Sequence, residues 1–231
     1  RIGVFGNATI DASGVAGGGR VVIGGDLLGK AKDVANVTLA DNTVIGAGAT
    51  IKIGSAQGDG GFVETSGKSL TMLGSVDGKS AGKSGQWLID PTDITISSSA
   101  STATNTNNTW AGAGATAIVN NASIEGALNT GTNVTITTAS AGGAGGNITV
   151  ANGISKTAGT VATLTLLANQ SITFNNGVNI TATSSALNLN VSAAQGGGNG
   201  AVTFSGNTIG TNGGALIVNG GSASATTNGV V

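Results

Sequence analysis

Short runs in which an aliphatic residue alternates with Thr or Asn constrain the fold of this chain most. Clear examples are Leu164-Thr165-Leu166, Ile172-Thr173-Phe174 and Leu187-Asn188-Leu189. This spacing of two is typical of β-strands that bury one face and expose the other. Gly or Asn interrupts almost every window in which apolar residues could recur at helical spacing. The chain is therefore predicted to be all-β.

These runs come in groups of three, and the groups repeat. Clear groups begin at residues 162, 186 and 215, which are 24 and 29 residues apart. Periods in the twenties with three short strands each are typical of the coils of a β-solenoid. A β-sandwich or barrel also spaces its strands regularly, but this chain has no Tyr and only four Phe to fill such a core. At this period, the 231 residues correspond to roughly ten coils.

The composition excludes several classes of function. Charged residues make up 8% of the chain, the net charge is −1, and there is no Cys or His. Nucleic-acid binding is not expected, because it depends on clustered positive charge. The lack of His removes the commonest general base and the commonest zinc ligand. No apolar run approaches the roughly 18 residues of a membrane span. We expect no catalysis, no cofactor, no metal and no membrane span.

The stretch GQWLIDPTDITI at residues 85–96 contains the only Pro of the chain. Two apolar runs flank a polar turn, which predicts a strand, a corner and a second strand. In this corner, Trp87 is expected to cover the core, and Asp90 and Pro91 to turn the chain. Asp93 is expected to cap backbone N–H groups after Pro91. The alternative is an acid pair, Asp90 with Asp93, that binds a cation or acts in acid–base catalysis.

The charge distribution divides the chain. After Asp93 only Glu125 and Lys156 are charged. We predict sparsely charged coils over residues 1–96, a polar loop excursion over 97–117, and nearly uncharged coils over 118–231, all in one continuous solenoid. A single helical turn is expected within residues 122–129, with Asn121 or Ser123 as N-cap and Glu125 in the first turn.

Two further hypotheses about ligand binding each rest on a single residue type. Asp26, Asp59 and Asp77 lie in Gly-rich links and could bind calcium, but the calcium-binding nonapeptide repeat is absent, which favours turn aspartates. Fragments of Thr-x-Thr, such as Thr163-Leu164-Thr165, could form an ice-binding face. Their irregular spacing favours Thr and Asn ladders that satisfy one another and the turns.

Asn-x-Ser/Thr sequences are possible glycosylation sites, although many arise by chance in a chain rich in Asn and Thr. They begin at Asn7, Asn36, Asn107, Asn121, Asn133, Asn147, Asn169, Asn179 and Asn190.

Three stretches, in this order and spacing, carry a resemblance to a known family. They are IDASG at 10–14 with GGGRVVIGGD at 17–26, GDGGFVETSGK at 58–68 running on to 85–96, and SIE at 123–125 with LNTGTNVTI at 128–136 and ISK at 154–156. They resemble the exoproteins of bacterial two-partner secretion, the filamentous-haemagglutinin-like and high-molecular-weight adhesins. The Asn-Pro-rich secretion motifs of that family are not found, which suggests a segment downstream of its secretion domain.

The resemblance implies a right-handed parallel β-helix, secreted through an outer-membrane pore to the bacterial cell surface. It implies a role in adhesion, aggregation or biofilm assembly, with a host cell, a neighbouring cell or another copy as partner. Some of these adhesins carry sugars on Asn-x-Ser/Thr asparagines. From the residues themselves, the alternative is an extracellular filament or matrix subunit that stacks end to end, because open coil ends invite strand pairing.

Overall fold

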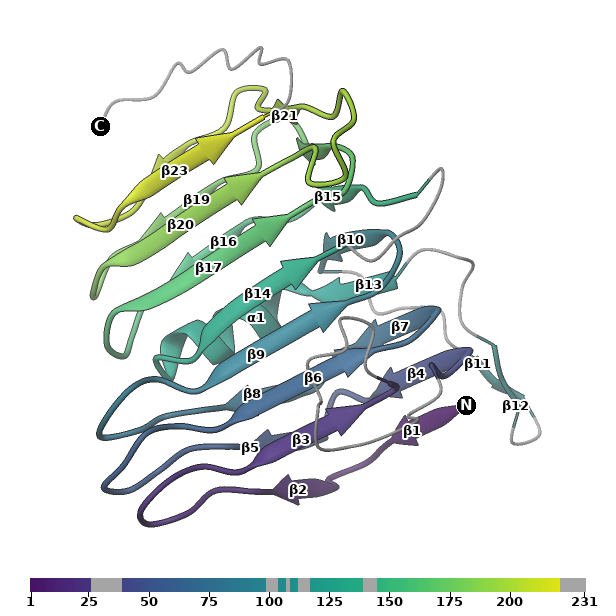
Figure 1. Cartoon of the computed structure of the whole chain (residues 1–231), viewed down its shortest axis with the longest axis vertical. Coiled ribbons are helices and arrows are strands. Elements are labelled where there is room, and N and C mark those ends of the chain that lie inside the picture. Colours follow the sequence, from purple (N-terminus) through teal and green to yellow (C-terminus); the bar gives the residue numbers. More distant parts are fainter. Residues whose placement is uncertain (26–38, 99–103, 107–108, 112–116, 139–144, 221–231) are drawn as a thin grey trace.

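The structure is a computed structural model that describes residues 1–25, 39–98, 104–106, 109–111, 117–138 and 145–220. With the N-terminal strands at the bottom, the front strands run from left to right as the chain climbs, which is the path of a right-handed coil (Figure 1). The paired strands of the rod are all parallel. This confirms the predicted right-handed parallel β-helix.

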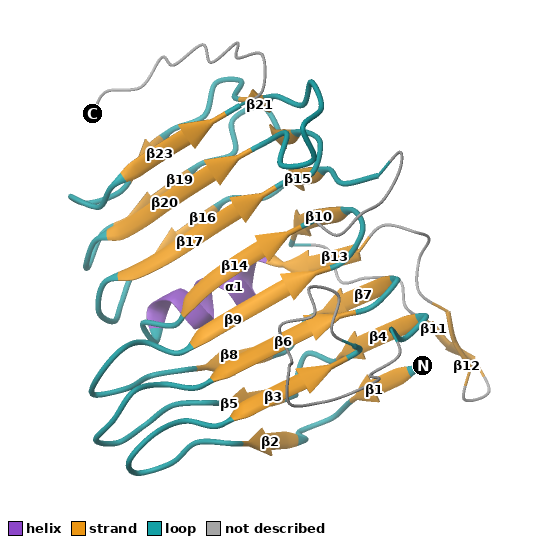
Figure 2. Cartoon of the chain, viewed as in Figure 1, coloured by secondary structure: helices purple, strands orange, loops and turns teal. Residues whose placement is uncertain are grey.

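Three sides of the rod carry stacked strands (Figure 2). The front sheet contains β3 (Arg20–Ile23), β6 (Phe62–Ser66), β9 (Gln86–Asp90), β14 (Asn133–Thr137), β17 (Ala162–Leu167), β20 (Leu187–Ser192) and β23 (Leu216–Asn219). The back sheet contains β1 (Ile2–Val4), β4 (Asn42–Ile45), β7 (Ser69–Met72), β13 (Ala117–Asn120), β10 (Ile94–Ser97), β15 (Ile148–Val150), β18 (Ile172–Phe174) and β21 (Val202–Thr203). The third side holds β2 (Thr9–Asp11), β5 (Thr50–Lys52) and β8 (Ser75–Asp77), and separately β16 (Ile154–Lys156), β19 (Ile180–Ala182) and β22 (Ile209–Gly210).

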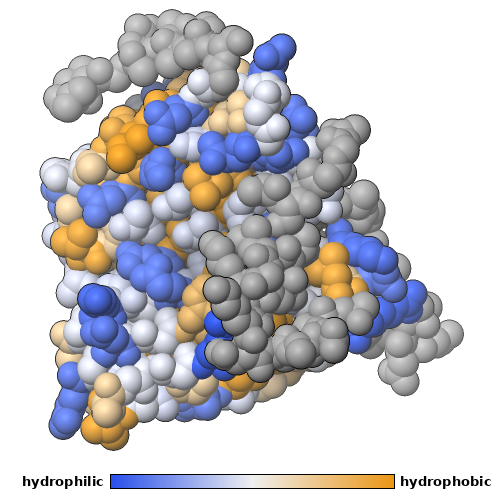
Figure 3. Space-filling view, viewed as in Figure 1, coloured by the Kyte–Doolittle hydropathy of each residue, from blue (hydrophilic) through white to orange (hydrophobic). Residues whose placement is uncertain are grey.

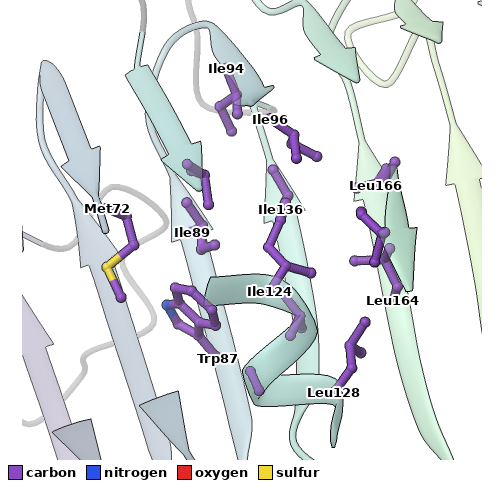
Figure 4. Packing of buried hydrophobic residues seen from close by; sticks show 14 of the residues in the cluster. Met72, Trp87, Ile89, Ile94, Ile96, Ile124, Leu128, Ile136, Leu164 and Leu166 are labelled. Atoms are coloured by element: carbon purple, nitrogen blue, oxygen red, sulfur yellow. The ribbon is translucent and has the colours of Figure 1, made fainter. Parts of the chain in front are cut away.

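Alternate residues of each strand form apolar columns inside the rod. In the front sheet, Trp87 lies over Val63 and under Val134, and Val134 pairs with Leu164. All four side chains are buried, and Trp87 and Leu164 are among the residues labelled in Figure 4. Burying a side chain of this size contributes roughly 1.5–3 kcal/mol, so the columns and the backbone ladders stabilise the rod together. The predicted alternation is confirmed, with Leu164, Leu166, Ile172, Phe174, Leu187 and Leu189 all buried.

The described part of the rod has fewer coils than the roughly ten expected, as its seven-stranded front sheet shows. Long Gly-rich links between the third side and the front sheet account for part of the difference. In these links the backbones pack so closely that a Cβ on Gly18 would lie 2.1 Å from Ile53 O and 2.3 Å from Gly61 N. Glycine is therefore needed there for close approach rather than for a turn.

One layer departs from the three-strand plan. From β9 the chain enters β10, leaves the rod, and returns as β13, which lies between β7 and β10. The excursion includes an antiparallel hairpin of β11 (Thr104–Thr106) and β12 (Thr109–Ala111), which projects to the right in Figure 1. Of the predicted excursion over 97–117, the structure describes β11, β12 and the two ends, which lie in β10 and β13.

A helix, α1 (Asn121–Asn129), replaces the third strand of this layer and separates β8 from β16. The predicted N-cap was wrong: Asn120 caps the helix and accepts from Ala122 N–H at 2.8 Å. The helix follows β13 directly, so the last strand residue, which is still extended, is in position to cap. Glu125 consequently lies beyond the first turn of α1, and that first turn contains no acidic residue.

The C-terminus of α1 is closed by a Schellman motif. Gly131 has φ of +86°, its N–H donates to Leu128 O, and Thr132 N–H donates to Ala127 O. This pair of bonds satisfies carbonyls that would otherwise lack a partner at the helix end.

Candidate functional site

The corner between β9 and β10 contains the residues that the sequence singled out. Trp87 is buried, and its Nε1–H donates to Thr65 Oγ1 at 3.1 Å. Asp90 is the last residue of β9 and is fully buried. The chain passes through Pro91 and Asp93 from the front sheet to the back sheet. Asp90 and Asp93 thus belong to different sides of the rod.

Asp93 caps backbone N–H groups, but not local ones as the sequence suggested. Its Oδ1 accepts from Gly146 N–H at 2.9 Å and from Asn147 N–H at 2.8 Å. The reason is the strand register, in which Ile94 pairs with Ile148, so the residues before these strands face each other. Asp93 therefore joins two layers of the rod.

The same arrangement continues up the back sheet. Asn147 Oδ1 accepts from Ser171 N–H at 3.2 Å, and Ser171 Oγ accepts from Ala201 N–H at 3.2 Å. Asp93, Asn147 and Ser171 thus form a column in which each side chain caps the next coil. Similar caps join Asn133 to Thr163, Asn179 to Thr208 and Asn188 to Ala215. Polar residues before strands are here part of the scaffold.

A second polar cluster lies where α1 meets β16. Glu125 Oε1 accepts from Ser155 N–H at 2.9 Å. One turn before it, Asn121 Nδ2 donates to Gly153 O, and one turn after it, Asn129 Oδ1 accepts from Thr157 N–H. These helix positions are four residues apart, about 6 Å along the axis, and the strand positions are two apart, about 6.6 Å. The two spacings match, so this polar stripe of α1 bonds to β16 as a neighbouring strand would.

Lys156 points into the rod beside this junction and has no exposed surface. Its ammonium donates to Ala158 O at 2.6 Å and to Ser185 Oγ, and Ser185 Oγ donates to Thr160 O. Burial lowers the pKa of Lys156 from its ordinary value of 10.5, because a low-dielectric interior disfavours the charged form. The only sequence signal that this lysine is buried is the alternation of inward and outward residues along β16, which places Lys156 on the same face as Ile154.

Further acidic residues of the described part of the chain lie in the front sheet, in a Gly-rich link and at the end of β8. Glu64 and Asp90 are both fully buried in the front sheet, where Ser66 Oγ donates to Glu64 Oε1. Asp59 and Asp77 each accept from a backbone N–H, and Asp26 lies outside the described residues. Within the described part of the chain, no three His, Cys, Asp or Glu side chains gather to hold a metal ion.

A shallow groove of about 190 Å³ lies on the front sheet, lined by Phe62, Gln86, Trp87, Leu88 and Thr135. The Arg20 guanidinium lies 4.9 Å from the centre of the Phe62 ring, on the strand below. Over the rest of this face, hydrophilic, intermediate and hydrophobic residues are mixed among those drawn in colour (Figure 3). The Thr163 and Thr165 side chains contribute to it, in register with Asn188 and Asn190.

The structure sorts the asparagines of the possible glycosylation sites by accessibility. Asn7, Asn147 and Asn179 are exposed, Asn121, Asn133 and Asn190 are half-buried, and Asn169 is buried. Asn36 and Asn107 lie outside the described residues. The Nδ2 of Asn121, the atom to which a sugar would attach, is used in its bond to Gly153 O.

Comparison with known protein families and with curated proteins gives no match for this chain. In the part of the chain that the structure describes, no helix has the length and apolar character needed to cross a membrane.

Proposed function

We propose that this chain is a structural segment of a secreted bacterial surface exoprotein, a stiff β-helical stalk in an adhesin or filament, without catalytic activity. The observation that carries the proposal is the continuous front sheet, in which seven strands stack in parallel from β3 to β23. Continuous ladders and apolar columns resist bending and stretching along the rod, since each coil is supported by its neighbours. The family resemblance of residues 10–26, 58–96 and 123–156 supports secretion through a partner pore.

The distribution of polar groups supports a scaffold role rather than an enzyme. Asp93, Glu125 and the ladder asparagines bind backbone N–H groups of neighbouring layers. An active site requires groups that converge on a substrate instead.

The proposal is tested by removing one coil from the parent exoprotein in the bacterium that makes it. Deleting residues 148–171 removes β15, β16 and β17 and lets β18 take the place of β15. A stalk should shorten by about 4.8 Å, remain on the cell surface and support unchanged adhesion. Absence of the intact exoprotein from the surface in immunogold microscopy would contradict secretion. Loss of adhesion by a folded, surface-exposed deletion variant would show that this segment binds the receptor itself.

A second candidate function is self-assembly, favoured by apolar residues exposed near the ends of the described rod. Leu216 and Ile217 on β23 are 46% and 49% exposed, and Ile2 on β1 is 41% exposed. The β23 residues form an apolar patch at the upper left of Figure 3. Stacking β1 to β3 of one copy on β21 to β23 of another would continue the parallel pairing and cover these side chains. Light scattering at high concentration tests this, and monomers throughout would contradict it.

A further inference from the structure

The layer that contains α1 is joined to its neighbours by fewer backbone ladder pairs than the other layers of the rod. On the third side, α1 interrupts the ladder, so β8 and β16 have no strand between them. On the back sheet, β13 pairs with β7 over only two residues, Ile118 with Thr71 and Val119 with Met72. Ladders of two pairs otherwise occur only at the upper end of the described rod, between β18 and β21 and between β19 and β22. Elsewhere the ladders are longer, since β4 pairs with β7 over four residues and β17 pairs with β20 over six. Only the front sheet runs through this layer with ladders of four pairs on each side.

Side chains replace the missing ladder at this layer. Above α1, the stripe of Asn121, Glu125 and Asn129 bonds to the edge of β16. Below α1, Gly78 N–H donates to Thr132 Oγ1 at 2.7 Å. The apolar side of α1 still closes the core, with Ile124 and Leu128 buried in the same cluster as Trp87 (Figure 4). The core is thus continuous while the ladder on the third side is not.

We propose that the α1 layer is a built-in division of the β-helix, at which the coils over residues 148–219 and those over residues 1–90 open as two separate cooperative units. In a stack of repeats, cooperativity is carried by the interfaces between neighbours, so a weak interface sets the boundary between units. The division follows from the fold alone and does not depend on the stalk role. In a stalk under tension, it would let one half open while the other stays folded.

Hydrogen exchange of the native chain, followed residue by residue at increasing denaturant, tests this division. The exchange rates of amides in β6 and β9 should share one dependence on denaturant concentration, and those of amides in β17 and β20 should share another. The change from one dependence to the other should fall at α1. Glu125→Ala leaves Ser155 N–H without its acceptor and should speed exchange by about tenfold throughout whichever unit opens first. Glu125→Gln keeps an acceptor oxygen and should largely restore the original rates.

The control is Asn188→Ala, which removes the same kind of cap between β20 and β23. It should speed exchange only in the unit of residues 148–219 and leave the unit of residues 1–90 and the step at α1 unchanged. A single denaturant dependence on both sides of α1, or a gradual change from coil to coil, would overturn the proposal. An effect of Glu125→Ala confined to residues around Ser155 would overturn it as well.

Discussion

Glu125 and Lys156, the only charged residues after Asp93, meet at one strand, β16. Glu125 Oε1 accepts from Ser155 N–H, and the next residue, Lys156, turns its ammonium into the rod. The strand β16 is the first of its sheet, and its lower edge faces a helix instead of another strand. Charge in this half of the chain is thus used where the regular ladder stops.

Lys156 predicts a pH dependence of stability. Its pKa in the folded chain is below the ordinary value of 10.5 because of burial. At a pH between the folded pKa and 10.5, the unfolded chain therefore binds more protons than the folded chain. The free energy of unfolding therefore gains a contribution that rises with pH up to about 10.5 and is flat below the folded pKa. Lys156→Met should remove this contribution, which urea denaturation of both proteins from pH 7 to 11 would measure. Parallel pH profiles for the two proteins would show that Lys156 titrates normally.

Two glycines predict opposite effects of the same substitution. Gly126 lies within α1 and has no atom within 4 Å of its potential Cβ, so Gly126→Ala should stabilise the chain by about 0.5–1 kcal/mol. Gly18→Ala would place its Cβ 2.1 Å from Ile53 O, and it should destabilise the chain by about 1–3 kcal/mol, as overpacking does. Thermal unfolding followed by circular dichroism compares them. Equal effects would mean that the Gly-rich links do not pack closely.

Removing the Asp93 carboxylate should lower the stability of the chain, because two backbone N–H donors would lose their acceptor. Asp93→Ala leaves Gly146 N–H and Asn147 N–H without their acceptor, and it should lower the free energy of unfolding by about 1–3 kcal/mol. Asp93→Asn keeps Oδ1 and should cost less. Denaturation midpoints in urea would rank the three proteins, and an Asp93→Ala midpoint equal to the original would contradict the cap.

The repeated strands were predictable from sequence, whereas the α1 layer was only partly so. The alternation in Leu164-Thr165-Leu166 determines which side chains are buried, because a strand has only two faces. The helix could be anticipated around residues 122–129, but its cap at Asn120 depends on where β13 ends. The order of β13 and β10 in the back sheet has no local signal, since both are short apolar runs that suit either position.

The polar contacts were the least predictable part of the candidate site. Asp93 was identified as a cap, but its partners lie 53 and 54 residues further along the chain. Only the register of β10 with β15 brings them together. Likewise, Asn121, Glu125 and Asn129 are spaced as one helix face, but that this face would bond to β16 follows from the replacement of a strand by α1.

The inward and outward faces of β17 predict a contrast between neighbouring substitutions. Leu166 is fully buried, between Ile136 below and Val191 above, so Leu166→Asp would place a charge in the core without a partner and should unfold the adjacent coils. Thr165 is half-buried on the outer face, and Thr165→Asp keeps its carboxylate hydrated, so the loss should stay within about 1 kcal/mol. Circular dichroism and thermal melting of the two variants measure the contrast. If Leu166→Asp melted like the original chain, the inward assignment of β17 would be wrong, and with it the alternation on which the whole coil assignment depends.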